Sequence, residues 1–264
     1  TKAMANELNV VGLMNVQYAL KDGQLYVLEV NPRASRTIPF VSKATGVTLA
    51  KLATKVMLGR TLQGLELTAE IVPAHISVKE AVLPFDRFPD VDLLLGPEMK
   101  STGEVMGIGS DFGSAYAKAQ LGADQNLPTA GTVFISVVDN DKKTVLPLAA
   151  KYRDAGFKIM ATRGTSRFLA DNGIPNKAVN KVSAGRPHVV DAIKNAEIQL
   201  VINTSIGGET RRDGYYIRRN ALRYKVPYAT TTAGGMAIYR AIEALRQKKT
   251  TVKTIQEYNS EVPS

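Results

Sequence analysis

Cysteine and tryptophan are absent from this chain of 264 residues, and histidine occurs only at His75 and His188. Without cysteine there can be no disulfide, no thiol catalysis and no cysteine-ligated zinc, and the composition suits a reducing, cytoplasmic environment. Two histidines nearly exclude a multi-histidine metal site, and we interpret both as structural rather than catalytic. No apolar run approaches the roughly 18–20 residues of a membrane span, so we expect no membrane partner.

Positive charge is the component present in excess, and it is confined to the second half of the chain. Residues 1–124 contain 12 Lys and Arg against 13 Asp and Glu, whereas residues 125–264 contain 22 against 11. A basic half could bind nucleic acid, an anionic surface or a small phosphorylated ligand, or could simply be a soluble surface. Because this half has few aromatic residues on which bases could stack, we expect no nucleic-acid partner.

The polar segment 123–131, which contains Pro128, separates two differently patterned halves. We place a domain boundary near residue 124, giving domains 1–124 and 125–264. The chain starts at Thr1 without an initiator methionine or a signal peptide, so we expect a piece of a longer protein.

Apolar strand patterns alternate with helical patterns throughout the second half. The predicted strands are 132–138, 157–161, 178–182, 198–203 and 227–231. The predicted helices are 142–154, 165–172, 187–196, 215–225 and 234–247. This order predicts an α/β fold with a doubly wound parallel sheet covered on both faces, whose ligands bind beyond the carboxyl ends of the strands.

The first half opens with a hairpin pattern, in which apolar residues occupy the even positions of 16–20 and of 26–30. An odd loop, most simply the three residues 22–24, would place these positions on one face and Gln17 opposite Glu29.

Carboxylate, amide and guanidinium groups converge on the other face of this hairpin and on the loop that leaves it. They are Gln17, Glu29, Asn31, Arg33 and Arg36. Oxygen ligands suit Mg²⁺, and arginine forks suit phosphate oxygens, so we predict a metal site with Arg33 and Arg36 as catalytic residues. The alternative is a solvated edge strand with ordinary surface arginines.

Polar groups also follow successive strands of the basic half. The turn 162–166 opens a predicted helix and could hold an anion on its backbone N–H groups, while Lys142, Lys181 and residues 203–205 follow three other strands. The alternative is that Thr165 caps its helix and that the lysines are solvated. We interpret the arginine pairs 211–212 and 218–219 most simply as a solvated loop and helix face, with a contact to a nucleotide phosphate as the alternative.

Long sequence strings in the first half resemble the large subunits of carbamoyl-phosphate synthases. They are Gly12–Gln17 (GLMNVQ), Leu28–Arg33 (LEVNPR), Phe40–Gly46 (FVSKATG), Ser77–Phe85 (SVKEAVLPF) and Leu95–Gly107 (LGPEMKSTGEVMG). The resemblance implies that residues 1–124 are the C-terminal part of an α+β ATP-grasp lobe. It implies that Gln17, Glu29 and Asn31 ligate Mg²⁺ or Mn²⁺ and that Gln17 and Glu29 also line the ATP site.

The second half resembles the methylglyoxal-synthase-like allosteric domain of the same family. The resemblance implies a site for a regulatory nucleotide, UMP or IMP, formed by Lys142, Thr162, Thr165, Lys181, Asn203 and Ser205. Position 205 is Ser where Thr is expected, so the hydroxyl is retained and the methyl group is lost. An activating amino acid, ornithine, would be held by Glu80, Tyr228 and Thr230.

The function implied by the resemblance is synthesis of carbamoyl phosphate from bicarbonate, glutamine-derived ammonia and ATP, for arginine and pyrimidine biosynthesis. The implied partner is a glutaminase small subunit, with a possible homo-oligomer of the full heterodimer, and the piece alone is expected to be inactive. The alternative is a free-standing methylglyoxal-synthase-like phosphate-binding protein or lyase. That enzyme family has a His-Asp pair after its first strand and a Gly-Gly-Asp near its third helix, where this chain has VDNDK (138–142) and GRPHV (185–189).

Overall fold

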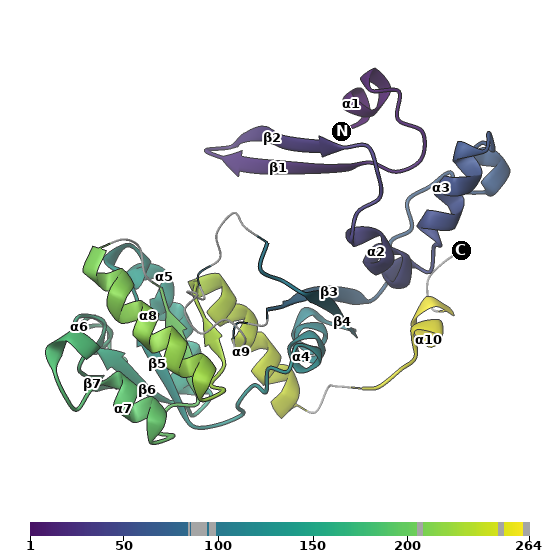
Figure 1. The fold of residues 1–264 in the computed structure, drawn as a ribbon. Helices are drawn as coiled ribbons and strands as arrows, with labels where there is room; N and C mark the ends of the chain where they lie inside the picture. The colour runs from purple at the N-terminus through teal and green to yellow at the C-terminus, as the bar shows by residue number, and fades with distance from the viewer. Residues whose placement is uncertain (84, 86–93, 95–98, 205–207, 248–250, 261–264) are drawn as a thin grey trace. The chain divides into compact units, whose positions relative to one another are not determined.

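A computed structural model describes residues 1–83, 85, 94, 99–204, 208–247 and 251–260 (Figure 1). The described residues form two compact units. The first contains Thr1–His75 and the segment that starts at Val252, and the second contains Ile76–Thr251. None of the described helices is long and apolar enough to cross a bilayer.

The hairpin of the first unit consists of the antiparallel strands β1 (Asn15–Lys21) and β2 (Gln24–Asn31). Its loop is the two-residue turn Asp22-Gly23, so the predicted three-residue loop is wrong. Both turn residues have positive φ, 51° and 77°, which matches the twist of the flanking strands better than an ordinary type I or type II turn would.

A register shift beside Gln17 and Tyr18 nevertheless restores the predicted pairing of Gln17 with Glu29. The shift is a bulge, which places one extra residue on β2. Between the bulge and the turn the predicted faces are wrong, because Tyr26 pairs with Ala19 and not with Leu20.

Short helices complete the first unit. They are α1 (Lys2–Glu7), α2 (Thr37–Thr45), α3 (Leu49–Met57), the 3₁₀ turn η1 (Gln63–Leu65) and α10 (Ile255–Ser260). His75 is buried in this unit, where its Nε2 lies 2.9 Å from the carbonyl oxygen of Ala44 and its ring packs edge-on against Tyr258. These contacts agree with the structural interpretation of His75.

The second unit begins with the antiparallel pair β3 (Ile76–Val82) and β4 (Gly103–Gly109), against which α4 (Phe112–Gly122) packs. Asp111 starts α4 by accepting the Ser114 backbone N–H at 3.0 Å. Helix α4 also packs against α9, so β3, β4 and α4 belong to the same compact unit as the helices that follow. The division between the two units therefore falls after His75. The domain boundary near residue 124 describes a different division, by pattern and charge, and stays a prediction.

The core of the second unit is a five-stranded parallel sheet of order β7-β6-β5-β8-β9. Its strands are β5 (Thr132–Ser136), β6 (Lys158–Thr162), β7 (Lys177–Val179), β8 (Leu200–Asn203) and β9 (Tyr228–Ala229). Its helices are α5 (Lys142–Asp154), α6 (Arg163–Asp171), α7 (Val189–Lys194), α8 (Gly208–Arg223) and α9 (Thr232–Arg246). The predicted alternation of strands and helices and the α/β fold class are therefore confirmed.

Helices cover both faces of this sheet, as Figure 1 shows. Alternate side chains of the strands enter two separate apolar clusters, one with α5, α6 and α9 and the other with α7 and α8. Val133 and Ile135 belong to the first cluster and Phe134 to the second, and all three are fully buried. Strands that are apolar on both faces require this double covering.

Candidate functional site

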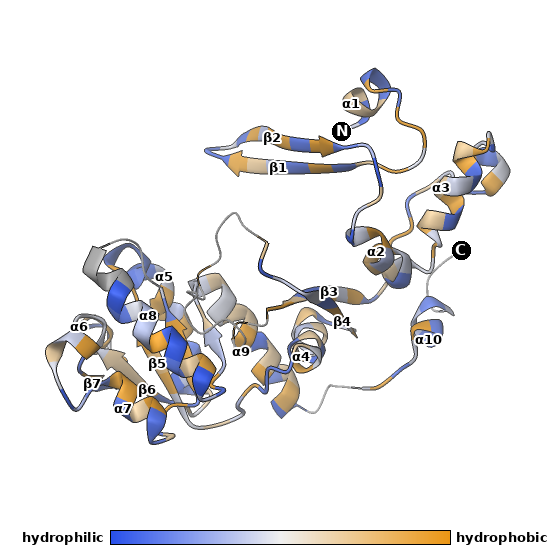
Figure 2. Cartoon of the chain, viewed as in Figure 1, coloured by the Kyte–Doolittle hydropathy of each residue, from blue (hydrophilic) through white to orange (hydrophobic). Residues whose placement is uncertain are grey.

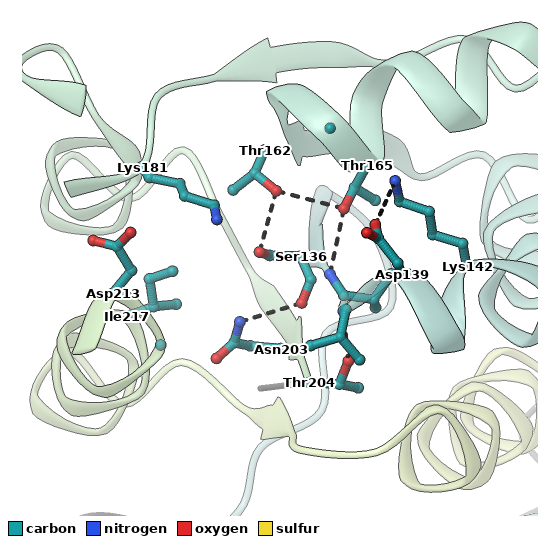
Figure 3. Close-up of a pocket in the computed structure, with 14 residues that line it drawn as sticks. Ser136, Asp139, Lys142, Thr162, Thr165, Lys181, Asn203, Thr204, Asp213 and Ile217 are labelled. Atoms are coloured by element: carbon teal, nitrogen blue, oxygen red, sulfur yellow. Dashed lines mark hydrogen bonds and ion pairs between the residues drawn. The ribbon is translucent and has the colours of Figure 1, made fainter. Parts of the chain in front are cut away.

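A pocket of about 330 Å³ lies at the carboxyl edge of the parallel sheet (Figure 3). Its walls come from residues that end or follow β5, β6, β7 and β8 and from one face of α8. The chain adds β6 and β7 on one side of β5 and then β8 and β9 on the other, so the strand order reverses at β5. Doubly wound sheets bind ligands at such a crevice.

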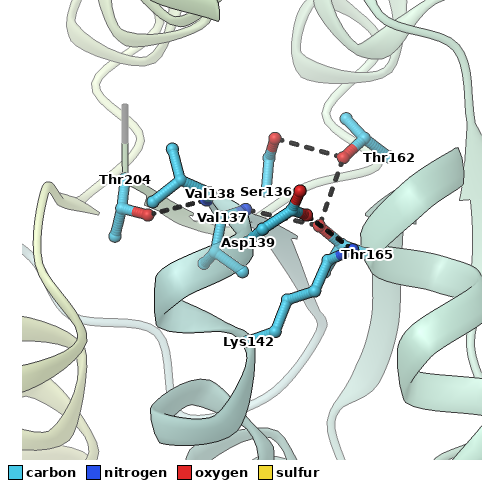
Figure 4. Close-up of polar contacts among 8 residues, drawn as sticks. All are labelled: Ser136, Val137, Val138, Asp139, Lys142, Thr162, Thr165 and Thr204. Atoms are coloured by element: carbon cyan, nitrogen blue, oxygen red, sulfur yellow. Dashed lines mark hydrogen bonds and ion pairs between the residues drawn. The ribbon is translucent and has the colours of Figure 1, made fainter. Parts of the chain in front are cut away.

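Hydroxyl groups organise the floor of the pocket (Figures 3 and 4). Ser136 Oγ lies 3.2 Å from Thr162 Oγ1, and Thr165 Oγ1 accepts the Val137 backbone N–H at 3.3 Å. Thr204 Oγ1 accepts the backbone N–H of Val138, the residue after Val137, at 3.2 Å. These bonds hold the turn after β5 against the ends of two neighbouring strands, so the pocket is preformed.

Helix α6 starts on the pocket wall. Its N-cap residue Thr162 makes no side-chain capping bond, so the first-turn N–H groups have no hydroxyl partner from that residue. A Cβ at Gly164 would meet no atom within 4 Å, which leaves open space in front of this turn. Thr165 lies in the first turn rather than at the N-cap, so the alternative that it merely caps its helix is wrong.

Two lysines bring positive charge to the pocket, Lys142 from the start of α5 and Lys181 from the segment after β7. Lys142 Nζ lies 2.8 Å from Asp139 Oδ1 and 5.9 Å from the centre of the Phe168 ring. The hydrogen bond and charge of Lys142, with a further contribution from the charge of Lys181, lower the pKa of Asp139. The carboxylate of Asp139 is therefore ionised at neutral pH.

Helix α8 contributes polar groups beside the pocket that the preferred sequence interpretation did not place there. Arg218 is fully buried and donates from Nη1 to Asn203 Oδ1 at 3.0 Å, so its interpretation as a solvated residue is wrong. Asn203 Nδ2 in turn donates to the Ser136 carbonyl at 3.2 Å. The signal was present in the sequence, because Gly214, Ile217, Arg218 and Ala221 share the spacing of a buried helix face.

Asp213, also on α8, binds the segment that carries Lys181. Its two carboxylate oxygens accept the backbone N–H of Ser183 at 3.1 Å and the Ser183 hydroxyl at 2.8 Å. Helix α8 thus holds two strand-end segments of the pocket, one through Asp213 and the other through Arg218.

The structure brings five of the six predicted nucleotide residues to this one pocket: Lys142, Thr162, Thr165, Lys181 and Asn203. Ser205 lies outside the described residues. The contribution of each side chain to ligand binding stays a prediction.

Of the three predicted amino-acid effector residues, Glu80 lies on β3, and Tyr228 and Thr230 lie at and after β9. Glu80 receives a hydrogen bond from Gln120, yet burial raises its pKa above the usual value. Burial and the charge of Glu80 also raise the pKa of Tyr116, to about 12. A partly desolvated carboxylate is suited to pairing with an ammonium group.

Replacing Glu80 by glutamine is expected to raise the midpoint of thermal unfolding near pH 7. A raised carboxyl pKa means that folding disfavours ionisation; the penalty is absent below the unfolded pKa and grows as pH rises towards the folded pKa. The gain should therefore shrink towards pH 4. The measurement is thermal unfolding followed by circular dichroism at both pH values. Glu104→Gln, which removes a partly exposed partner of Lys79, is the control. If Glu80→Gln lowers the unfolding midpoint at pH 7 by more than Glu104→Gln does, the prediction is contradicted.

The hairpin of the first unit places the predicted metal ligands on one face. Gln17 is directly opposite Glu29, and Asn31 Nδ2 donates to Glu29 Oε1 at 2.8 Å. Arg33 Nη1 donates to the Ala34 carbonyl at 2.9 Å, and Arg36 is the residue before α2. Their oxygen donors fit Mg²⁺ or Mn²⁺, although the Asn31 amide would have to turn its oxygen towards the ion.

Comparison with known proteins gives two family matches. Residues 1–65 match the carbamoyl-phosphate synthase L chain, ATP binding domain, and residues 144–230 match the MGS-like domain. The carbamoyl phosphate synthase large chains of Nostoc sp. and Archaeoglobus fulgidus are each 56% identical to this chain, over 98% and 99% of it. The chain spans about a quarter of these relatives, 24% of each. A solved methylglyoxal synthase from Elizabethkingia anophelis matches 42% of this chain and 79% of its own at 20% identity, with a TM-score of 0.35, too low to support an inference.

Proposed function

This chain belongs to the family of carbamoyl phosphate synthase large chains, and we propose on that premise that it is the regulatory and partly catalytic section of such a ligase. The whole enzyme would make carbamoyl phosphate from bicarbonate, glutamine-derived ammonia and ATP, with a glutaminase small subunit as partner. It would serve arginine and pyrimidine biosynthesis in the cytoplasm. The chain alone would make no carbamoyl phosphate, because it corresponds to about a quarter of the length of its relatives.

The observation that carries the regulatory part of the proposal is the preformed pocket at the sheet edge. It combines two lysines, an open helix start and several hydroxyl and amide groups. A phosphate group would bind the first-turn N–H groups of α6 and the ammonium groups of Lys142 and Lys181. We therefore assign it to a nucleoside monophosphate effector, UMP or IMP.

The hairpin supports the catalytic part of the proposal. Gln17, Glu29 and Asn31 would hold Mg²⁺ or Mn²⁺ with ATP, and the guanidinium groups of Arg33 and Arg36 would contact phosphate oxygens. The ion, when bound, would neutralise phosphate charge and help to orient the γ-phosphoryl group.

Exposed apolar side chains on the same hairpin also support membership of a larger assembly. Leu20 and Leu28 are 74% and 64% exposed, and Figure 2 shows hydrophobic segments on both strands. Leu25, Tyr26 and Val27 are exposed as well, and apolar residues gathered on one exposed hairpin indicate an interaction surface. We propose that other parts of the large chain cover them in the whole enzyme.

Ornithine at Glu80, Tyr228 and Thr230 would be the second effector.

Calorimetric titration with UMP and IMP tests the effector assignment. Thr165→Ala is expected to weaken binding about fivefold to thirtyfold, because it removes a hydroxyl contact and a partner of the Val137 N–H, each worth about 1 kcal/mol. Thr144→Ala is the matched control, since its exposed hydroxyl donates to the nearby Asp141 carbonyl and, among the described residues, makes no other hydrogen bond. If the wild type binds neither nucleotide at millimolar concentration, or Thr165→Ala binds as well as Thr144→Ala, the assignment is wrong. Release of phosphate from dihydroxyacetone phosphate by the chain would favour the lyase alternative.

A further inference from the structure

One carboxylate of the pocket faces Lys142, one of the two lysines that would bind an anion. Asp139 Oδ1 lies 2.8 Å from Lys142 Nζ, and both residues line the pocket (Figures 3 and 4). The side chain of Lys142 is 24% exposed, whereas that of Asp139 is 90% exposed. The ammonium group therefore belongs to the pocket wall, and its partner reaches it from the solvent side.

The position of Asp139 involves the second lysine as well. The charges of both Lys142 and Lys181 lower the pKa of Asp139, although the two lysines come from different strand ends. Asp139 thus places one negative charge beside Lys142 and within the influence of Lys181. A ligand phosphate would need the same region.

Asp213, the other carboxylate of the wall, is not available for such a role. Both of its oxygens already accept bonds from Ser183, and it is 9% exposed. Asp139 instead starts the 3₁₀ turn η3 (Asp139–Asp141), where it is exposed and can swing away with little rearrangement. Exposed ion pairs of this kind are weak and readily exchanged.

We propose that Asp139 is an internal counter-ion that competes with the ligand for Lys142, so that anion binding exchanges the Asp139 carboxylate for a ligand oxygen. The inference rests on the proposed phosphate site and names the residue that sets its affinity. A phosphoryl dianion brings two charges in place of one, whereas a carboxylate or a halide brings only one. The exchange therefore favours a phosphorylated ligand over the more abundant monoanions.

The experiment compares Asp139→Asn with Asp141→Asn in calorimetric titrations with UMP and with inorganic phosphate at low salt. Both variants raise the net charge by one, but Asp141 is not among the residues that line the pocket. We expect Asp139→Asn to bind about two- to fivefold more tightly than the wild type. Asp141→Asn should stay within about 1.5-fold, because no ion pair links Asp141 to Lys142 among the described residues and the attraction between charges falls with distance.

A double-variant cycle tests the route of the effect. In a Lys142→Met background, the gain from Asp139→Asn should fall to about 1.5-fold or less, because the hydrogen-bonded partner for which the carboxylate competes is gone and only the weaker influence of Lys181 remains. An undiminished gain in that background, an equal gain in Asp141→Asn, or weaker binding by Asp139→Asn would each overturn the proposal. Without ligand, an NMR titration should find the pKa of Asp139 below its usual value and moved back towards it by Lys142→Met.

These outcomes separate this inference from the effector assignment. UMP binding with no gain in Asp139→Asn would keep the effector site and reject the counter-ion. Phosphate binding with the expected gain, but without binding of either UMP or IMP, would keep the counter-ion and reject the nucleotide assignment. Absence of binding by both the wild type and Asp139→Asn would reject both.

Discussion

Replacing Glu29 by alanine in the full-length protein is expected to lower ATP-dependent carbamoyl phosphate synthesis by at least about 100-fold. Glu29 is the only acidic residue in the two hairpin strands, and it lies opposite Gln17 and beside Asn31. Two neutral amides alone bind a divalent cation weakly, so removal of the carboxylate should abolish the metal site.

The loss should be traceable to the metal rather than to the fold. Mn²⁺ binding, followed by electron paramagnetic resonance, should weaken in parallel with activity, while circular dichroism and the unfolding midpoint of the chain stay unchanged because Glu29 is exposed. Glu7→Ala, at an exposed helical position of the same unit, is the matched control. Wild-type turnover in Glu29→Ala would refute the metal assignment.

Replacing Arg218 by methionine is expected to lower the free energy of unfolding by about 2–4 kcal/mol. Arg218 has no exposed surface, and its guanidinium donates to Asn203 Oδ1. Methionine keeps most of the apolar stem but leaves that buried acceptor without its donor. Urea unfolding of the chain measures the change, with a fall in the thermal midpoint of about 2–4 °C for each kcal/mol.

Arg223→Met is the control, because it removes the same charge from an exposed position of the same helix. It should change stability by less than about 0.5 kcal/mol. Adding Asn203→Leu to Arg218→Met should cost less than the sum of the two single changes, since the unsatisfied acceptor is then gone. Equal losses for Arg218→Met and Arg223→Met would show that burial of Arg218 contributes nothing.

The hairpin shows which features the alternation of apolar residues predicts and which it does not. Alternation correctly predicted both strands and the pairing of Gln17 with Glu29, because every second side chain shares a face. It failed for the loop, because the Asp22-Gly23 turn and the bulge each shift the register by one residue. The two shifts cancel at Gln17, so only the segment between them was placed on the wrong face.

Prediction of the pocket at the carboxyl edge of the sheet depended on residues that are far apart in the sequence. Polar residues after buried strands predicted the edge, since the carboxyl ends of parallel strands meet there. The roles of Asp139, Asp213 and Arg218 were not predicted. Asp213 and Arg218 bind residues that are distant in sequence, and the contact of Asp139 with Lys142 depends on how the turn after β5 is oriented.

The amino-acid sequence by itself determined the family, the α/β class, the alternation of strands and helices and the residue types available for phosphate and metal binding. These properties are local, because they depend on periodicity, turn chemistry and contiguous strings. Only the tertiary structure decided the strand order, the register of the hairpin and which charges become partners. Arg218 is buried against Asn203, and Asp139 faces Lys142, because packing of the helices and turns around the sheet leaves these pairs within hydrogen-bond distance.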